Sequence, residues 1–350
     1  MRKAVLVFRT GHLGDTVCAI PAFRLIRSHF ANEELVLLCD HLSDGDKVPA
    51  VEVVQSLGIF DRIITYTSGQ GVFSVWQLFR AVRAVQPSLL IILPQSQESV
   101  RRVRRKKRFF LGCGVADVRG LEMPGSRNGQ RPAEPDRLVG ILRGMGISGT
   151  KPAYDIPIDS ARRASVYEKL RSNSFDVGRP LIIFCGGGKV ATQCWPLERY
   201  AAVLSRLSAE MNCEVIGVGN SQEIDSYRAR VLPIFGALRL LSAPLTVPEL
   251  FELCRLASVY FGNDTGPMHV SAAVGCPVAV VMSGRNAPGM WDPDVELRLI
   301  IRHRTECENC FLTDCIVMQH RCMAEITVER VTAEVIPFVK SLLSRGAGTP

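Results

Sequence analysis

Short, continuous apolar runs alternate with amphipathic segments along this 350-residue chain, and several of the runs end in polar loops that contain glycine. The clearest case is the segment 259–269, Val-Tyr-Phe-Gly-Asn-Asp-Thr-Gly-Pro-Met-His. A short apolar run is typical of a buried strand, Gly, Asn, Asp and Thr form turns, and Pro267 suits the first position of a helix. The segment therefore predicts a strand, a polar loop and a helix, and Gly275 marks the end of that helix.

The same order of elements opens the chain and recurs after its midpoint. Ala4–Phe8 is a short apolar run, an amphipathic segment spans 21–30, and 35–39 is apolar again. A second set begins with the apolar run 180–185, after a proline-containing stretch at 151–159. Strand, loop, helix and strand in this order are typical of doubly wound α/β folds, and the chain is long enough for two such domains.

Charge and cysteine content narrow the class of protein. The net charge of +8 favours acidic partners such as nucleotides, phosphorylated lipids or an anionic membrane surface. The 12 cysteines are scattered, and the run Ala4–Phe8 is too short for a signal peptide, so we expect mostly free thiols in a reducing cytoplasm. The longest nearly uncharged stretch, 270–284, is shorter than a membrane span and contains Gly275 and Pro277. We expect a cytoplasmic protein that is soluble or lies on a membrane.

Two loops of the second half have the chemistry of an anion site. Ligands of open α/β sheets bind at the carboxyl ends of the strands, where the N–H groups of Gly266 to His269 would favour an anion. We expect His269 to be neutral and to bond a phosphate or ribose oxygen. Gly186-Gly-Gly188 lets backbone approach a ligand, and Lys189 could meet a phosphate. The alternatives are a well-capped structural helix and a flexible loop with an exposed lysine.

The loop after the first apolar run, Arg9-Thr-Gly-His-Leu-Gly-Asp15, matches neither the dinucleotide fingerprint nor the P-loop. Asp15 lies where the first strand gives way to its helix. It could cap that helix, or it could act as the general base for an incoming hydroxyl. The two roles oppose each other, because a carboxylate that accepts several backbone N–H bonds is a weaker base.

Two further clusters carry possible binding chemistry. The cationic run Arg101–Arg108 is either a solvated face or a site for an anionic lipid, an acidic sugar or nucleic acid. Near the C-terminus, thiols at Cys307, Cys310, Cys315 and Cys322 could close a tetrahedral zinc or iron site. The alternatives for these thiols are free cysteines or disulfides.

Motifs in both halves together resemble the heptosyltransferase family, glycosyltransferase family nine. Members open with R-x-G-x-x-G-D…P, found here at positions 9–21, and carry N-D-[ST]-G-P-x-H, found at 263–269. Trp195-Pro196 and Cys322-Met323 also match, so the resemblance covers nearly the whole chain. It implies a GT-B fold, in which two Rossmann-like domains face a cleft. The expected parts are an acceptor-binding domain at 1–155, a nucleotide-sugar-binding domain at 175–327, and a terminal helix at 328–350 packing back toward the first domain.

The resemblance also implies roles for individual residues. Asp15 is similar to the catalytic base that deprotonates the acceptor. Donor binding is implied for the second-domain set Gly187, Gly188, Lys189, Glu249, Asp264, Thr265, Gly266 and His269, with Glu249 at the nucleoside. Acceptor binding is expected for the first-domain set Arg9, Gly11, His12 and Gly14. One position departs from the family, because Gln193 stands where members commonly have a lysine that neutralises the diphosphate.

The implied reaction is an inverting, metal-independent transfer of a heptose or related sugar. The expected donor is ADP-heptose, and the expected acceptor is a lipopolysaccharide core or related glycolipid. No cofactor is expected for catalysis, and the late cysteines could hold structural zinc or iron. Contact with the inner face of the cytoplasmic membrane fits the charge. The alternatives are a GT-B-type nucleotide-sugar epimerase and a basic nucleic-acid-binding protein that uses Arg101–Arg108.

Overall fold

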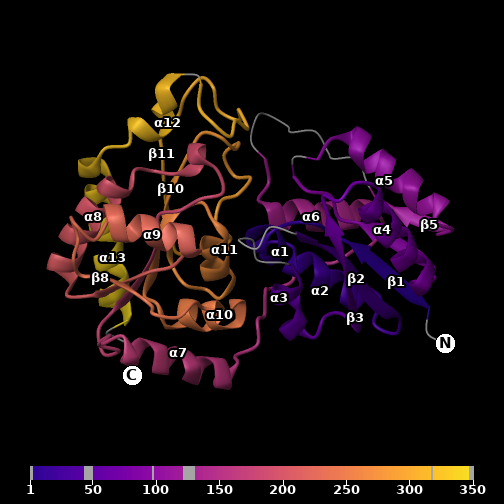
Figure 1. Cartoon of the computed structure of the whole chain (residues 1–350), viewed down its shortest axis with the longest axis horizontal. Helices are drawn as coiled ribbons and strands as arrows, with labels where there is room; N and C mark the ends of the chain where they lie inside the picture. Colours follow the sequence, from indigo (N-terminus) through magenta and orange to yellow (C-terminus); the bar gives the residue numbers. More distant parts are fainter. Residues whose placement is uncertain (1–2, 43–49, 97, 121–130, 317, 347–350) are drawn as a thin grey trace. The chain divides into compact units, whose positions relative to one another are not determined.

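The computed structural model describes residues 3–42, 50–96, 98–120, 131–316 and 318–346. The chain divides into two compact units, and the main boundary falls between Pro157 and Ile158. Unit 1 comprises Met1–Asn128 and Pro132–Pro157, and unit 2 comprises Gly129–Arg131 and Ile158–Pro350. Each unit contains its own sheet (Figure 1).

Unit 1 is built on a five-stranded parallel sheet with the order β3-β2-β1-β4-β5. The predicted first strand is the centre of the sheet, because Val5 pairs with Leu35 on one side and with Leu89 on the other. Its burial on both faces explains the unbroken apolar sequence. The strands are β1 (Ala4–Phe8), β2 (Glu34–Leu42), β3 (Arg62–Ser68), β4 (Leu89–Ile92) and β5 (Asp117–Arg119).

Helices cover both faces of this sheet. The helices of unit 1 are α1 (Leu13–Val17), α2 (Ile20–His29), α3 (Ala50–Val54), η1 (Gln55–Leu57), α4 (Val72–Val85), α5 (Val100–Gly112) and α6 (Glu134–Gly144). Val82 of α4 and Phe110 of α5 pack on Leu6, Phe8 and Ile92 in one cluster. Helices α2 and α6 pack against each other and lie outside this cluster, as expected for the opposite layer of a doubly wound sheet.

Unit 2 is built on a six-stranded parallel sheet with the order β11-β10-β9-β6-β7-β8. Counted from its own first strand, this is the 3-2-1-4-5-6 order of dinucleotide-binding folds. The strands are β6 (Leu181–Cys185), β7 (Glu214–Gly217), β8 (Leu238–Leu240), β9 (Val259–Asn263), β10 (Val278–Met282) and β11 (Arg298–Arg302). The two units together confirm the prediction of two doubly wound, Rossmann-like domains.

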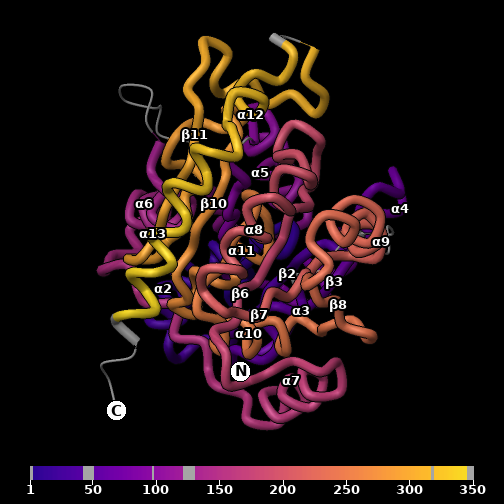
Figure 2. Tube along the Cα trace, turned by 90° about the vertical axis from the view of Figure 1, so that its left-hand side faces the viewer, coloured from indigo at the N-terminus to yellow at the C-terminus, as the bar shows by residue number. Residues whose placement is uncertain are grey.

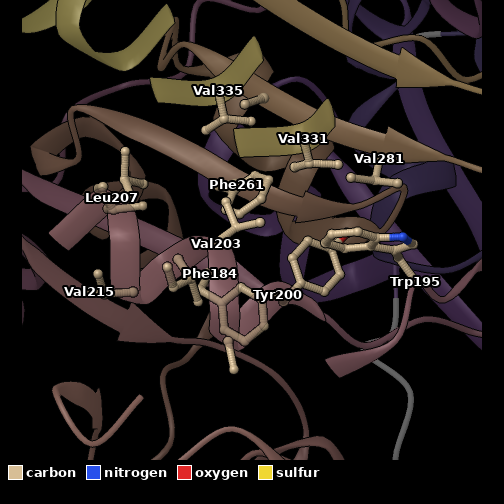
Figure 3. Packing of buried hydrophobic residues seen from close by; sticks show 14 of the residues in the cluster. Phe184, Trp195, Tyr200, Val203, Leu207, Val215, Phe261, Val281, Val331 and Val335 are labelled. Atoms are coloured by element: carbon tan, nitrogen blue, oxygen red, sulfur yellow. The ribbon is translucent and has the colours of Figure 1, made fainter. Parts of the chain in front are cut away.

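The helices of unit 2 surround one large core. They are α7 (Ser160–Ser172), η2 (Ala191–Gln193), α8 (Leu197–Met211), α9 (Ser221–Arg230), α10 (Val247–Leu256), α11 (Gly266–Ala273), η3 (Met318–His320), α12 (Arg321–Ala324) and α13 (Val328–Gly346). In this core the rings of Trp195 and Tyr200 meet edge to face, with centroids 4.8 Å apart (Figure 3). Within the described part of the chain, no helix is both long and apolar enough to cross a membrane.

The last helix belongs to unit 2. The apolar stripe of α13, formed by Val331, Val335 and Val339, is buried in the core of this unit. Its packing toward the first domain stays a prediction. The stripe has helical i, i+4, i+8 spacing and packs against α8 and β11 (Figures 2 and 3). Residues 328–346 therefore complete the second unit, which extends beyond the predicted end at residue 327.

The strand orders locate the ligand-binding edge of each unit. In unit 1 the order reverses between β1 and β4, and in unit 2 it reverses between β6 and β9. Ligands of open α/β sheets bind beyond the carboxyl ends of the strands at such a reversal. The segment Arg9–Asp15, the loop Gly186–Gly188 and the loop after Asn263 all begin at these strand ends.

Candidate active site

Arg9, at the end of β1, is buried rather than presented to a ligand. Only 1% of its surface is exposed. Its Nη1 donates to the Pro94 carbonyl at 2.8 Å, and its Nη2 lies 3.2 Å from Glu134 Oε1. Both terminal nitrogens of the guanidinium are therefore bonded to the protein's own groups, which argues against the expected contact of Arg9 with the acceptor.

This buried cluster also contains Glu134 and Arg137, two residues of α6 that no sequence motif marks. Arg137 donates to both oxygens of Glu134 at 2.6 Å and to the Pro94 carbonyl at 2.7 Å. Arg9 also donates to the Asp15 carbonyl at 3.1 Å. The cluster thus holds the loops after β1 and β4 to the start of α6. The only signal in the sequence is an ion pair spaced i, i+3 at the start of a helix that is otherwise largely apolar.

Asp15 caps the start of its helix with one carboxylate oxygen and leaves the other oxygen available. It is the third residue of α1, and its Oδ2 accepts the His12 backbone N–H at 3.1 Å. Asp15 is half-buried, and among the described residues its Oδ1 accepts no hydrogen bond. The predicted capping role is therefore present, and one oxygen remains for the second predicted role, that of a base.

Gly11 shapes the segment that leads to Asp15. Gly11 has a φ of 147°, and a Cβ at this position would lie 2.5 Å from the Asp15 Cβ. Its N–H donates to Asp40 Oδ1 at 3.1 Å. Gly14 is in the first turn of α1, and its carbonyl accepts the N–H of Cys18. Gly11 therefore makes room for the Asp15 side chain, while acceptor contact by His12 and Gly14 remains a prediction.

In unit 2, Asn263 joins the two predicted donor loops. It lies at the end of β9 and is fully buried. Its Nδ2 donates to the carbonyls of Gly186 at 2.6 Å and Gly187 at 3.0 Å, and its Oδ1 accepts from Trp195 N at 3.1 Å and Tyr200 Oη at 2.7 Å. These bonds use the whole hydrogen-bonding capacity of the amide, so they fix the loops after β6 and β9 together.

The glycine loop after β6 is held firmly, which argues against the flexible-loop alternative. Tyr227 Oη accepts the N–H groups of Gly186 at 3.0 Å and Gly187 at 3.1 Å. Burial raises the pKa of the Glu223 carboxyl group, and the nearby Gly188 backbone partly offsets this. The N–H groups of Gly186 and Gly187 are therefore already engaged by Tyr227. Lys189 is the exposed cation that the loop presents.

Glu223 is a candidate site residue that no sequence motif marks. It lies just beyond β7 in the first turn of α9, where it caps the helix with Asn220. Burial raises the pKa of its carboxyl group. A Cβ at Gly187 would lie 1.9 Å from Glu223 Oε1, so glycine is needed there for the carboxylate to fit. An acidic residue beyond the second strand of a Rossmann unit is the signal that could have identified it.

The four predicted residues after β9 come together at the start of α11. His269 Nε2 lies 3.5 Å from Asp264 Oδ1, and both side chains are less than a tenth exposed. The Thr265 hydroxyl lies 3.1 Å from Tyr260 Oη. The predicted row of free N–H groups is shorter than expected, because Met268 and His269 donate back to the Thr265 carbonyl. Within the described chain, the Gly266 N–H has no such bond and is the donor left at this helix end.

Glu249 is buried among donors of its own unit, which argues against its expected contact with the nucleoside. It is 2% exposed. Its Oε2 accepts from Lys169 Nζ at 2.8 Å and from the Thr246 N–H at 2.8 Å, and its Oε1 accepts from Ser165 Oγ at 2.7 Å. Burial alone would raise the pKa of Glu249, but the bonds from Lys169, Thr246 and Ser165 outweigh it and lower the pKa to about 2. Both oxygens therefore hold α7 against α10.

The late cysteines do not form a metal site as they are placed. Cys307, Cys310 and Cys315 are half-buried on an irregular segment, and Cys322 is buried in α12. All four lie in the described ranges, and across those ranges no three His, Cys, Asp or Glu side chains are grouped so that they could hold a metal ion. In the described structure these four thiols are therefore not grouped, and a structural zinc or iron at them stays a prediction.

Comparison with known proteins agrees with this arrangement. Residues 142–320, just over half of the chain, match the model of glycosyltransferase family 9 (heptosyltransferase). Lipooligosaccharide heptosyltransferase 2 of Campylobacter jejuni is 20% identical over 94% of this chain and 96% of that protein. Lipopolysaccharide heptosyltransferase 2 of Escherichia coli is 26% identical over 58% of this chain and 61% of that protein.

Solved structures show that the fold is shared along the chain. A family 9 glycosyltransferase from Veillonella parvula superposes with a TM-score of 0.76 at 16% identity, covering 97% of this chain and 98% of that one. The E. coli ADP-heptose lps heptosyltransferase II gives 0.68 at 16% identity, covering 97% and 99%. These likenesses confirm the predicted GT-B fold. By the family match over half of its length, the chain belongs to glycosyltransferase family 9, the heptosyltransferase family, and is a glycosyltransferase.

Proposed function

We propose that this glycosyltransferase moves a heptose from ADP-heptose to the core of a lipopolysaccharide or a related glycolipid. The observation that carries the proposal is the pair of loops at the strand reversal of unit 2, which Asn263 fixes together. The relatives support the substrate class, since two are named as heptosyltransferases of lipooligosaccharide and lipopolysaccharide. A solved relative with a TM-score of 0.62 is an E. coli heptosyltransferase with ADP-2-deoxy-2-fluoro heptose.

Unit 2 holds the donor in this proposal. The diphosphate lies by Gly266, whose N–H is left at the start of α11, and by the exposed Lys189. Lys189 takes the place of the family lysine that Gln193 replaces. We assign the ribose to Glu223 instead of Glu249, because Glu223 lies at the glycine loop and a carboxylate accepts hydroxyl protons well. Asp264 and His269 bond the donor beside the loop.

Asp15 accepts the proton of the acceptor hydroxyl through Oδ1. The hydroxyl oxygen bonds to the anomeric carbon, and the bond from that carbon to the diphosphate oxygen breaks. Attack opposite the leaving group inverts the configuration at this carbon. Negative charge grows on the diphosphate during this step, and Lys189 with the Gly266 N–H stabilises it without a metal step. We place the reaction in the cytoplasm, at the membrane that carries the glycolipid.

Replacing the proposed base tests the mechanism. Asp15→Asn keeps the size of the side chain but removes its proton-accepting charge, so transfer should fall by about 10²–10⁴-fold. Binding of ADP should stay unchanged, because Asp15 belongs to unit 1. The control is Asp225→Asn, which alters an exposed carboxylate on α9. Wild-type transfer by Asp15→Asn would disprove the assignment.

The donor and the reaction type need separate measurements. Thermal stabilisation by ADP-, GDP-, UDP- and dTDP-sugars should be largest with ADP-heptose. Incubation with UDP-N-acetylglucosamine alone should give no isomer, whereas an epimerase would form one. A metal chelator should leave the rate of heptose transfer unchanged if the step uses only the chain's own cations, and a loss restored by added metal would contradict metal independence.

A further inference from the structure

Helix α4 exposes an apolar ridge that its own unit does not cover. Val72, Phe73, Val75, Trp76 and Phe79 are all exposed, with Val72 at 85% and Trp76 at 48%. Together they occupy the first half of the helix. The rings of Phe73 and Trp76 are stacked with centroids 5.8 Å apart, so the ridge has a continuous aromatic part. Exposed apolar surface of this kind marks sites of interaction with a protein or a membrane.

A cationic helix lies beside this ridge. Helices α4 and α5 pack in the same cluster on one face of the sheet, so their outer sides face away from it together. Both helices start at the carboxyl edge of the sheet, after β3 and β4, and run back along it. Arg83 of α4 reaches the turn after α5, where a Cβ at Gly114 would lie 3.0 Å from its Nη1. The apolar half of α4 is therefore level with the cationic start of α5.

The charge on these two helices has one sign. From Gln70 to Gly114 the sequence contains nine Lys and Arg and a single carboxylate, Glu98, which is paired with Lys106 at 2.6 Å. The exposed cations of α5 are Arg101, Arg102, Arg104, Arg105, Lys107 and Arg108. Arg80 lies over the Trp76 ring at 4.9 Å, which joins the ridge to the cations. A second copy of this surface would meet it with like charges, so self-association is disfavoured.

We propose that the α4–α5 surface, meaning the ridge of α4 with the exposed cations of α5, docks the protein on an anionic lipid bilayer. Aromatic side chains favour the membrane interface, and lysine and arginine stems extend so that their charges reach the phosphates. Val72 and Val75 gain by entering lipid but have no role in base stacking, so a bilayer fits the surface better than nucleic acid. The inference rests on the proposed function in one respect, that the acceptor is a glycolipid.

Vesicle binding measures docking without donor or acceptor, so the docking proposal and the transferase proposal can fail separately. The full chain should sediment with vesicles of phosphatidylcholine and phosphatidylglycerol, and much less with phosphatidylcholine alone. Arg101→Glu/Arg105→Glu should weaken this binding by about 25-fold or more, since each cation near an anionic surface contributes about fivefold. The matched control is Arg162→Glu/Arg206→Glu, which makes the same change in net charge at exposed positions of unit 2. Equal weakening by both pairs would overturn the proposal.

Trp76 reports whether the ridge itself enters the lipid. Brominated lipids should quench the intrinsic fluorescence of the bound protein, and Trp76→Phe should bind similarly but lose most of the quenching. Trp195 is buried and Trp291 is half-buried, so they serve as internal references. Undiminished quenching in Trp76→Phe would place another surface in the lipid and overturn the proposal.

Other partners would give different results. Tighter binding to DNA than to anionic vesicles, or a dimer abolished by Phe73→Ser/Trp76→Ser, would assign the surface to nucleic acid or to a second copy. Either result would overturn the proposal. Transfer to a soluble, lipid-free acceptor should continue in Arg101→Glu/Arg105→Glu. This activity would show that the variant is folded.

Discussion

Single buried polar residues connect segments that are distant in the sequence. Asn263 joins the loops after β6 and β9, and Glu134 joins Arg9 of β1's loop to Arg137 of α6. Each connection uses nearly all of the hydrogen-bonding capacity of its side chain. Their removal should therefore be costly, because the partners would remain buried without compensation.

Glu134→Gln tests the buried charge cluster. The variant leaves Arg9 and Arg137 buried without a counter-ion, which should lower the free energy of unfolding by about 3–5 kcal/mol. The matched control is Glu198→Gln, which breaks an exposed pair with Arg230 and should cost about 1 kcal/mol or less. Urea denaturation measures both, and equal effects would contradict the special role of the cluster.

Gly187→Ala tests the close approach of Glu223 to the glycine loop. The added Cβ would lie 1.9 Å from Glu223 Oε1, so the carboxylate must move. Calorimetric titration with ADP should show a binding free energy that is weaker by about 1–3 kcal/mol, because overpacking usually costs that much free energy. The control Gly236→Ala has its nearest contact at 3.8 Å and should bind ADP normally.

A comparison of Glu223→Ala with the double variant Gly187→Ala/Glu223→Ala shows whether the clash causes the loss of ADP affinity. Gly187→Ala/Glu223→Ala removes the steric conflict but also the proposed ribose contact. It should therefore bind ADP as Glu223→Ala alone does. A further loss in the double variant would mean that Gly187 acts through another contact.

At the scale of elements, α7 is attached to α10 by a buried carboxylate. Lys169 and Ser165 of α7 both donate hydrogen bonds to Glu249 of α10. The backbone N–H of Thr246, the N-cap of α10, donates to the same carboxylate. This attachment explains why α7, which follows the proline-containing stretch, packs within unit 2.

The depressed pKa of Glu249 predicts a pH-dependent contribution to stability. The folded pKa is about 2, against a usual 4.5, so the ionised form is favoured by folding. This contribution, about 3 kcal/mol, should be fully present above pH 4.5 and should be lost as the pH falls toward 2. The difference in unfolding free energy between the wild type and Glu249→Gln should therefore be largest at pH 7 and shrink below pH 4.5. A difference that stays constant from pH 7 to pH 3 would show that ionisation of Glu249 is not its source.

At the scale of the whole molecule, each unit has its own hydrophobic core. The core of unit 1 includes Val82 of α4, and that of unit 2 includes Val335 of α13. Both side chains are almost completely buried, at 1% and 0% exposed. A cavity in one core should therefore act first on the unit that contains it.

A pair of core substitutions tests this division. Val335→Ala should speed hydrogen exchange in β6 to β11, whereas Val82→Ala should speed it in β1 to β5. Each variant should lose about 1–3 kcal/mol of stability, since each leaves a small cavity. Peptide-level mass spectrometry measures both patterns. Faster exchange in unit 1 on Val335→Ala would instead support the original expectation for the last helix.

Much of the fold could be predicted from the sequence because its information is local. The apolar runs at Ala4–Phe8, 180–185 and 259–261 became central strands, since a strand buried on both faces needs apolar side chains throughout. Pro267 and Gly275 bound α11, because proline suits the start of a helix and glycine its end. Asp15 could be placed at its strand end for the same reason.

Only the tertiary structure decided which polar groups are available to a ligand. Arg9 and Glu249 matched expected binding positions, but both are buried against partners far away in the chain, and Glu223 had no motif to mark it. The apolar stripe of α13 could be read from its spacing, but its partner could not. Local sequence sets backbone preference and burial, whereas hydrogen-bond partners depend on which distant segments the fold brings within about 3 Å.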